Sequence, residues 1–252
     1  MSLGDAMEAK VLLGSFISFD IIASASTRLP LSFLNLDHRR ILNTLDINLE
    51  SLFGCTNQVM ALILDIVCLE NWKKEAEEAH QLSLVELVKR GAMIEERLRQ
   101  EIIDVERVYS LEKNIMKSHD RILSTAQVEI TNIFALSATT YLHVVISGAY
   151  PELPEIVESV SKTIDAFKSL TEPRLLRNLV WPFCVTGCLA SGGQQGFFRE
   201  LVSKAEITSF TLGTCFQAFK IMEECWELRK TRLYNCDWAF VMNRRGCDVL
   251  LL

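Results

Sequence analysis

Apolar residues recur three and four positions apart along most of this chain, and this spacing limits the fold more than any other feature. Between residues 6 and 25 the pattern is carried by Val11, Leu12, Phe16 and Ile22. Such spacing places apolar side chains on one face of an α-helix. No stretch alternates apolar and polar residues over the length of a strand. The 252 residues therefore predict an all-α fold, a multi-helix bundle of about eight helices.

Residues that start or stop helices mark several boundaries. Thr56 and Asp237 are suited to cap the helices that follow them, and residues 83–86 form a capping box. Gly148 is suited to the left-handed turn that closes a helix beginning near residue 119. These signals predict helices at 57–78, from 84 onward, up to 147, and from 238 onward.

The clearest connector is residues 148–154, where Pro154 fits the first position of the next helix. Two organisations stay open: one all-α domain over residues 1–252, or two subdomains joined at this connector. Beyond it, we expect one helix from 174 to about 190, kinked at its interior Pro182.

The charge balance is acidic. Lys and Arg number 26 against 32 Asp and Glu, which gives a net charge of −6. The basic residues cluster only as dipeptides such as Lys73-Lys74 and Arg244-Arg245. A DNA-binding surface is usually basic, because neutralising phosphates supplies much of its affinity. We therefore expect this chain by itself not to bind DNA tightly.

The eight cysteines do not have the spacing of a zinc site. Cys184 and Cys188 are neighbours on one helix face, which allows a redox or metal pair. Two small buried side chains in a reducing compartment is the preferred interpretation. Asp5 and Glu8 precede the first apolar run, which argues against a cleavable signal peptide. The sequence predicts an intracellular chain with reduced thiols and no metal or cofactor.

The mean hydropathy of +0.20 is high for a soluble protein. Residues 130–150 and 180–198 contain no Asp, Glu, Lys or Arg, and both are long enough to approach a membrane span. Thr, Ser, Asn and His interrupt the first, and Pro182 and several glycines interrupt the second. We expect both to be interior helices of a soluble bundle rather than membrane segments.

Motifs for catalysis are missing from the sequence. The four histidines lie far apart and outside any H-E-x-x-H pattern, and no serine stands in G-x-S-x-G. Residues 187–192 have the glycine spacing of a phosphate loop without its Lys and Ser/Thr. We predict that the chain is not an enzyme.

Three polar residues on apolar helices need partners. Asp20 and Asp65 have apolar neighbours on both sides, so each is either a tuned acid or a carboxylate that bonds a neighbouring loop. The loop contact is preferred. His143 lies in an apolar helix, and a hydrogen-bonded core histidine is preferred over a general base.

Several short segments, in order, resemble the fungal-specific transcription factor regulatory domain, the helical region that accompanies a zinc binuclear cluster in fungal regulators. The segments cover nearly the whole chain: residues 19–24, 29–30, 53–55, 69–72, 174–176, 179–182, 187–188, 221–226 and 236–238. The resemblance implies an all-α regulatory region that acts in the nucleus on RNA polymerase II transcription. It implies DNA contact through a zinc cluster that this chain lacks, with co-regulators, a small-molecule effector or a second copy as partners.

The absent zinc cluster leaves three origins open: an excised regulatory region, a truncated gene product, or a paralogue without its DNA-binding part. Within the family fragments, Trp181, Phe183 and Trp226 suggest an apolar effector pocket between helices. Core packing of these aromatic side chains is the alternative. A small-molecule-binding protein or enzyme on the same helical scaffold is the alternative function.

Overall fold

The computed structural model describes residues 3–33, 36–44, 54–112, 125–205, 213–231, 235–246, 249 and 251. In these residues the chain forms ten α-helices and one 3-10 helix, and no strand. The all-α prediction is confirmed. The helices are α1 (Leu3–Thr27), α2 (His38–Thr44), α4 (Asn57–Glu78), α5 (Leu84–Glu112), α6 (Thr125–Ser147), α7 (Pro154–Lys168), η1 (Pro173–Asn178), α8 (Val180–Cys188), α9 (Gln195–Lys204), α10 (Gly213–Lys230) and α11 (Trp238–Arg245).

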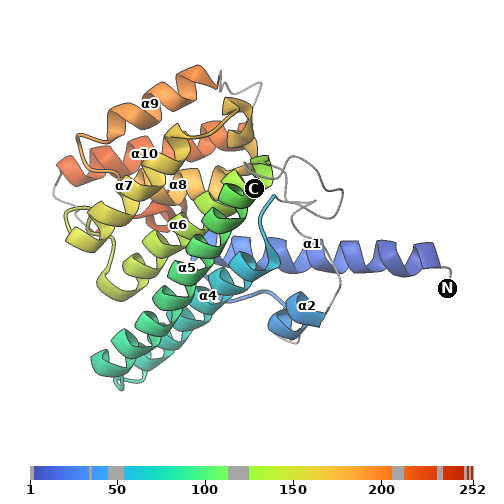
Figure 1. Ribbon diagram of the computed structural model, residues 1–252. Helices are drawn as coiled ribbons and strands as arrows, with labels where there is room; N and C mark the ends of the chain where they lie inside the picture. The colour runs from blue at the N-terminus through green and yellow to red at the C-terminus, as the bar shows by residue number, and fades with distance from the viewer. Residues whose placement is uncertain are drawn as a thin grey trace.

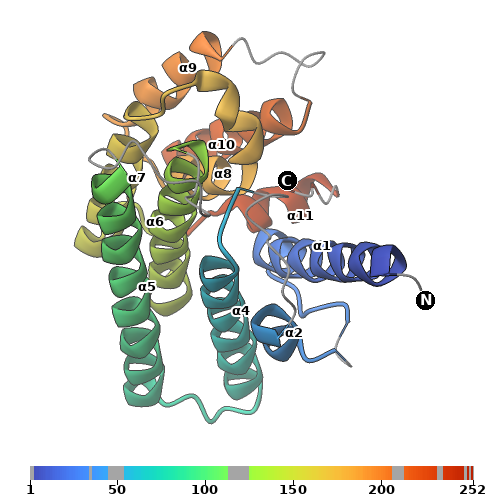
Figure 2. The ribbon, with the colours of Figure 1, turned by 45° about the vertical axis from the view of Figure 1, so that its right-hand side comes forward.

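Helix α6 forms the centre of the bundle (Figures 1 and 2). It packs against α4 and α5 on one side and against α7, α8 and η1 on the other. Helices α6 (Thr125–Ser147) and Glu8–Thr27 of α1 are long and apolar enough to cross a bilayer, but 78% of the apolar stretch of α6 is buried inside the protein. Helix α8 is buried along its whole length. Both segments predicted to be interior helices therefore lie in the core.

The ends of several helices are fixed by the residues that the sequence marked. The Val59 amide donates to Thr56 Oγ1 over 3.3 Å, and the Phe240 amide donates to Asp237 Oδ1 over 2.8 Å. Gly148 has a φ of +88° after α6. Pro154 is the first residue of α7, as predicted.

The region after residue 173 differs from the prediction of one kinked helix. The chain forms η1 and then α8, and the break falls at Leu179, whose φ and ψ are −120° and 24°. Pro182 lies in the first turn of α8 rather than in a helix interior. A proline is tolerated there because the first amide groups of a helix have no partner within it.

Two other expectations end differently. Residues 31–53 were expected to lack regular structure, but residues 38–44 form the short helix α2. The predicted start of a helix near residue 119 and the cysteine at 247 lie outside the described residues. The division into two subdomains at residues 148–154 stays a prediction.

Helix α1 extends away from the other helices toward the N-terminus (Figures 1 and 2). Its inner face buries Ile17 and Ile21 completely. Its outer face exposes Leu12, Phe16 and Phe19, with 59%, 55% and 40% of each residue's surface accessible. The helix therefore leaves an apolar stripe of four-residue and three-residue steps open to solvent.

Candidate functional site

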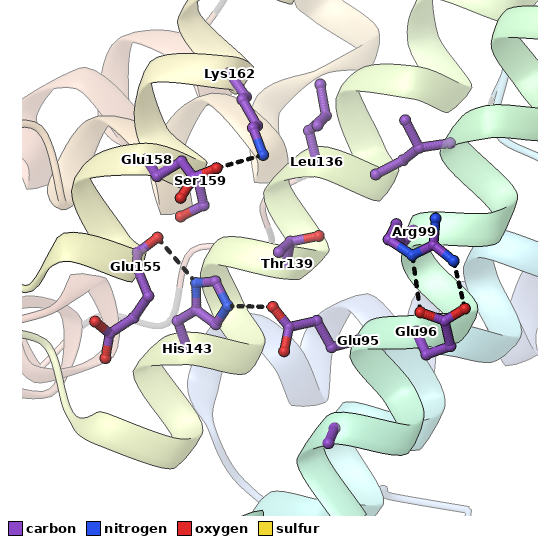
Figure 3. Close-up of a pocket in the computed structure, with 12 residues that line it drawn as sticks. Glu95, Glu96, Arg99, Leu136, Thr139, His143, Glu155, Glu158, Ser159 and Lys162 are labelled. Carbon is purple, nitrogen blue, oxygen red and sulfur yellow. Dashed lines mark hydrogen bonds and ion pairs between the residues drawn. The ribbon is translucent and has the colours of Figure 1, made fainter.

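Helices α5, α6 and α7 form an open groove whose lining is mostly polar (Figure 3). The two outer helices both pack on α6, so its residues form the floor and theirs form the walls. The cavity at this point has a volume of about 320 Å³. Its lining includes Glu95, Glu96 and Arg99 from α5, Leu136, Thr139 and His143 from α6, and Glu155, Glu158 and Lys162 from α7.

His143 joins the two walls of this groove. Its Nδ1 lies 3.1 Å from the backbone oxygen of Glu155, and its Nε2 lies 3.2 Å from Glu95 Oε1. Figure 3 shows the ring between these two partners. Both ring nitrogens therefore have hydrogen-bond partners, which confirms the prediction of a satisfied histidine. The side chain holds neighbouring helices together.

Ion pairs line the rims of the groove. Glu96 accepts two hydrogen bonds from Arg99, over 2.8 and 2.5 Å, and Glu158 pairs with Lys162 over 2.7 Å. The hydrogen bonds from Arg99 and Lys162 lower the pKa values of Glu96 and Glu158. Both carboxylates are exposed, so they present negative charge to anything that enters the groove.

A second polar assembly is buried where α1, α4, α6 and α11 meet. Arg28 Nε pairs with Glu70 Oε1 over 2.5 Å, and its Nη1 pairs with Asp237. The Tyr141 hydroxyl donates to Glu70 Oε2 over 2.5 Å, and Lys74 Nζ lies 3.2 Å from Glu70 Oε1. We call Arg28, Lys74, Glu70, Tyr141 and Asp237 the buried ion cluster.

Burial and charge act in opposite directions within this cluster. Burial lowers the pKa of the Arg28 guanidinium, but the charges of Asp237 and Glu70 outweigh it and hold the pKa above its ordinary value. Burial, followed by the Glu70 charge, raises the pKa of the Tyr141 hydroxyl. Arg28 stays cationic and Tyr141 stays neutral, so each carboxylate has a donor.

The whole chain, residues 1–252, matches the model of the fungal-specific transcription factor domain family. This chain belongs to that family. The match confirms the resemblance carried by the short segments along the sequence.

Relatives of this family member regulate biosynthetic genes in fungi, by their names. The trichothecene biosynthesis transcription regulator TRI10 of Trichoderma arundinaceum is 37% identical over 82% of this chain and 46% of its own length. The transcription factor ntnD of Nectria sp is 33% identical over 87% of this chain and 37% of its own length. The ustiloxin B cluster transcription factor ustR of Aspergillus flavus is 30% identical over 79% of this chain and 35% of its own length. No solved structure matches.

The family segments converge in the structure on the buried ion cluster. Glu70 and Asp237 belong to two of the segments, and Trp238 from the last one donates from Nε1 to the backbone oxygen of Ala25 over 3.2 Å. Tyr141 packs edge-on against both Trp238 and Trp181, at centroid distances of 5.8 and 6.1 Å. The residues that identify the family member are therefore mainly packing residues.

The three aromatic residues of the predicted effector pocket are each buried, in different surroundings. Trp181 stacks on Phe134 at 5.9 Å, and Phe183 packs against Phe198 at 5.8 Å. Trp226 donates from Nε1 to the backbone oxygen of Gly187 over 2.8 Å. None of the three lines the cavities described in this article. A ligand there would have to displace core side chains.

Both unusual acids have structural partners. Asp20 accepts from the amides of Ser32 and Phe33 over 2.8 and 3.2 Å and lies 2.8 Å from His38 Nε2, so the predicted loop contact is confirmed. The same prediction for Asp65 is wrong. Its carboxylate pairs with Arg97 of α5 over 2.5 Å and with Arg39 of α2. A nearly buried carboxylate is better compensated by two guanidinium groups than by a loop.

The cysteines are mostly core residues. Cys68 is exposed, and six others are buried: Cys55, Cys184, Cys188, Cys215, Cys225 and Cys236. Burial raises the pKa of Cys215 to about 12 and raises those of Cys188 and Cys225 well above their ordinary range. Within the described residues, no group of three or more His, Cys, Asp or Glu side chains is arranged to hold a metal ion.

The groove is the part of the site that sequence reasoning missed. Its charged residues had been interpreted as a solvated helix face of α5, and periodicity does not show which helices leave a gap between them. The dense acidic residues at matching steps of α5 and α7 were the available signal.

Proposed function

We propose that this chain is the regulatory region of a longer transcription factor that controls RNA polymerase II transcription of a fungal biosynthetic gene cluster. One observation carries the proposal: the family match covers the whole chain, yet the chain spans less than half the length of the named relatives. The additional length of such proteins provides room for a zinc cluster that contacts DNA. We place the factor in the nucleus.

The chain itself is proposed to bind neither DNA nor zinc and to catalyse no reaction. Its net charge of −6 makes long-range attraction to phosphate weak or repulsive. The groove histidine uses both ring nitrogens for structural hydrogen bonds. Gel-shift assays with short duplex DNA and zinc analysis after dialysis test this part. A salt-dependent shift, or one zinc per chain, would contradict it.

The regulatory role is tested by fusing residues 1–252 to an unrelated DNA-binding domain in a filamentous fungus. We expect reporter transcription from the matching operator to change severalfold relative to the DNA-binding domain alone. A fusion that is folded, nuclear and bound to the operator, but leaves transcription unchanged, overturns the proposal.

We also propose that the factor dimerises through the apolar stripe on α1. Leu12, Phe16 and Phe19 give this helix a seam suited to a second copy, because burying them removes apolar surface from water. Sedimentation velocity should show a dimer that Phe16→Glu converts to monomer. Val85→Glu, at a position that is 81% exposed on α5, is the matched control and should leave the dimer intact.

A small-molecule-binding role is the second candidate function, and one observation favours it. Trp181 Nε1 is buried without a hydrogen-bond partner, and a buried donor of this kind is costly unless a ligand or water satisfies it. Native mass spectrometry of the chain purified from a fungal host tests for a retained ligand. We expect Trp181→Phe to lose it, and a ligand-free wild-type chain rejects this candidate.

A further inference from the structure

The groove between α5 and α7 continues beyond the cavity shown in Figure 3. A second cavity of about 340 Å³ lies one turn further along the same three helices. Ile102 of α5 is followed there by Val105, Leu136 of α6 by Asn132, and Lys162 of α7 by Ala166. From residue 92 to residue 106 the groove is about 21 Å long, since a helix rises 1.5 Å per residue.

The floor of the groove combines apolar side chains with unused hydrogen-bond acceptors. Leu136, Val105 and Val128 present the apolar part. Asn132 Oδ1 and Glu129 Oε1 are buried, and neither has a hydrogen-bond partner among the described residues. Buried acceptors without donors are rare in a folded protein, so these two atoms point to a partner that brings donors.

The walls carry most of the groove's charge. Six carboxylates line the two cavities against the cations of Arg99 and Lys162, an excess of four negative charges with His143 neutral. The carboxylates are Glu95, Glu96, Glu106, Glu129, Glu155 and Glu158. The whole chain has a net charge of only −6, so the groove holds a concentrated negative field.

We propose that this groove binds a basic amphipathic helix of about four turns, supplied by a protein partner. Its apolar stripe would cover Leu136 and Val105, as helix-in-groove complexes do. Its lysine and arginine side chains would pair with the wall carboxylates and donate to Asn132 and Glu129. Nucleic acid is disfavoured here by the charge. The proposal concerns the partner helix and does not depend on the transcriptional role.

The probe is a synthetic 18-residue peptide with leucine at helical three-and-four spacing and lysine elsewhere. Fluorescence anisotropy should show that it binds the full chain, and that binding weakens severalfold between 50 and 300 mM NaCl because salt screens the charges. The same peptide with glutamate in place of lysine should not bind. Failure of the lysine peptide to bind overturns the proposal.

Two double variants with equal change in charge locate the contact. Glu96→Lys with Glu158→Lys reverses charge on both walls, and we expect at least a tenfold loss of affinity. Glu200→Lys with Glu227→Lys is the matched control, because those glutamates form similar exposed pairs with Lys204 and Lys230 outside the groove. Equal effects of the two double variants would mean non-specific attraction and would overturn the groove assignment.

A neutral variant guards against loss of folding in the charge-reversed protein. Thr139→Trp places an indole over the half-buried floor of the groove without changing the charge. With helical circular dichroism retained, we expect a tenfold weaker peptide complex. Unchanged affinity for this folded variant counts against the groove as the binding site.

Discussion

The buried ion cluster and the α5–α7 groove both contain carboxylates beside cations, but they treat those charges in opposite ways. In the cluster, Glu70 is 3% exposed and has donors from Arg28, Lys74 and Tyr141. In the groove, Glu96 and Glu158 stand in solvent and form pairs within their own helices. The cluster joins helices far apart in the sequence, whereas the groove walls are held mainly through α6.

This difference shows where family identity and individual specificity reside. All the segments that resemble the family lie before residue 73 or after residue 173, and none lies in α5, α6 or α7. Buried charge tolerates little change, because removing one partner leaves the other unpaired and desolvated. An exposed groove tolerates substitution at little cost to folding. Members of the family can therefore differ in their partners while keeping the same core.

The largest expected effect is on the family side of this comparison, at Trp226. Its ring is buried, and its Nε1 group bonds the Gly187 carbonyl. We expect Trp226→Ala to lower the free energy of unfolding by about 3–5 kcal/mol. Urea denaturation followed by circular dichroism measures the loss, with Phe240→Ala at a position 41% exposed as the control. An unchanged midpoint would refute the burial of Trp226.

The next effect tests the buried ion cluster directly. Glu70→Gln removes the charge that pairs with Arg28 and Lys74, so we expect a loss of about 3 kcal/mol in the free energy of unfolding. Glu77→Gln is the control on the same helix, because its pair with Lys73 is exposed and 3.9 Å long. Equal costs at the two positions would erase the distinction between buried and exposed charge.

A smaller effect is expected where α8 approaches α10. A Cβ atom at Gly187 would overlap the Met222 side chain. Methionine can shift its end, so we expect Gly187→Ala to cost about 1–3 kcal/mol in unfolding free energy. The variant combined with Met222→Ala should recover part of this loss in the same urea titration. No recovery would mean that the cost does not come from this contact.

The smallest effect is expected in the groove and depends on pH. The hydrogen bond from Lys162 lowers the pKa of Glu158 in the folded protein. A lowered pKa stabilises the folded state above the ordinary carboxyl pKa, and this contribution is lost as the pH falls through the folded-state pKa. Glu158→Gln should therefore lower the thermal midpoint slightly at pH 7 and leave it unchanged at pH 3. Glu200→Gln, which breaks a similar pair on α9, should behave alike.

Local chemistry along the sequence determined the helices and many of their ends. Thr56, Gly148 and Asp237 set boundaries through interactions with residues at most four positions away, so their roles can be read without the fold. The burial of Trp226 also follows from periodicity, because Met222, Phe219 and Cys215 share its helix face.

Only the tertiary structure decided which helix faces which, because periodicity defines a face and not its neighbour. It brought Arg39 and Arg97 to Asp65 from two different helices, and it joined Arg28 to Asp237 across 209 positions of sequence. It also spread the aromatic residues of the predicted pocket among separate contacts and opened a groove between α5 and α7. Contacts of this kind depend on how helices pack in space, which no local pattern specifies.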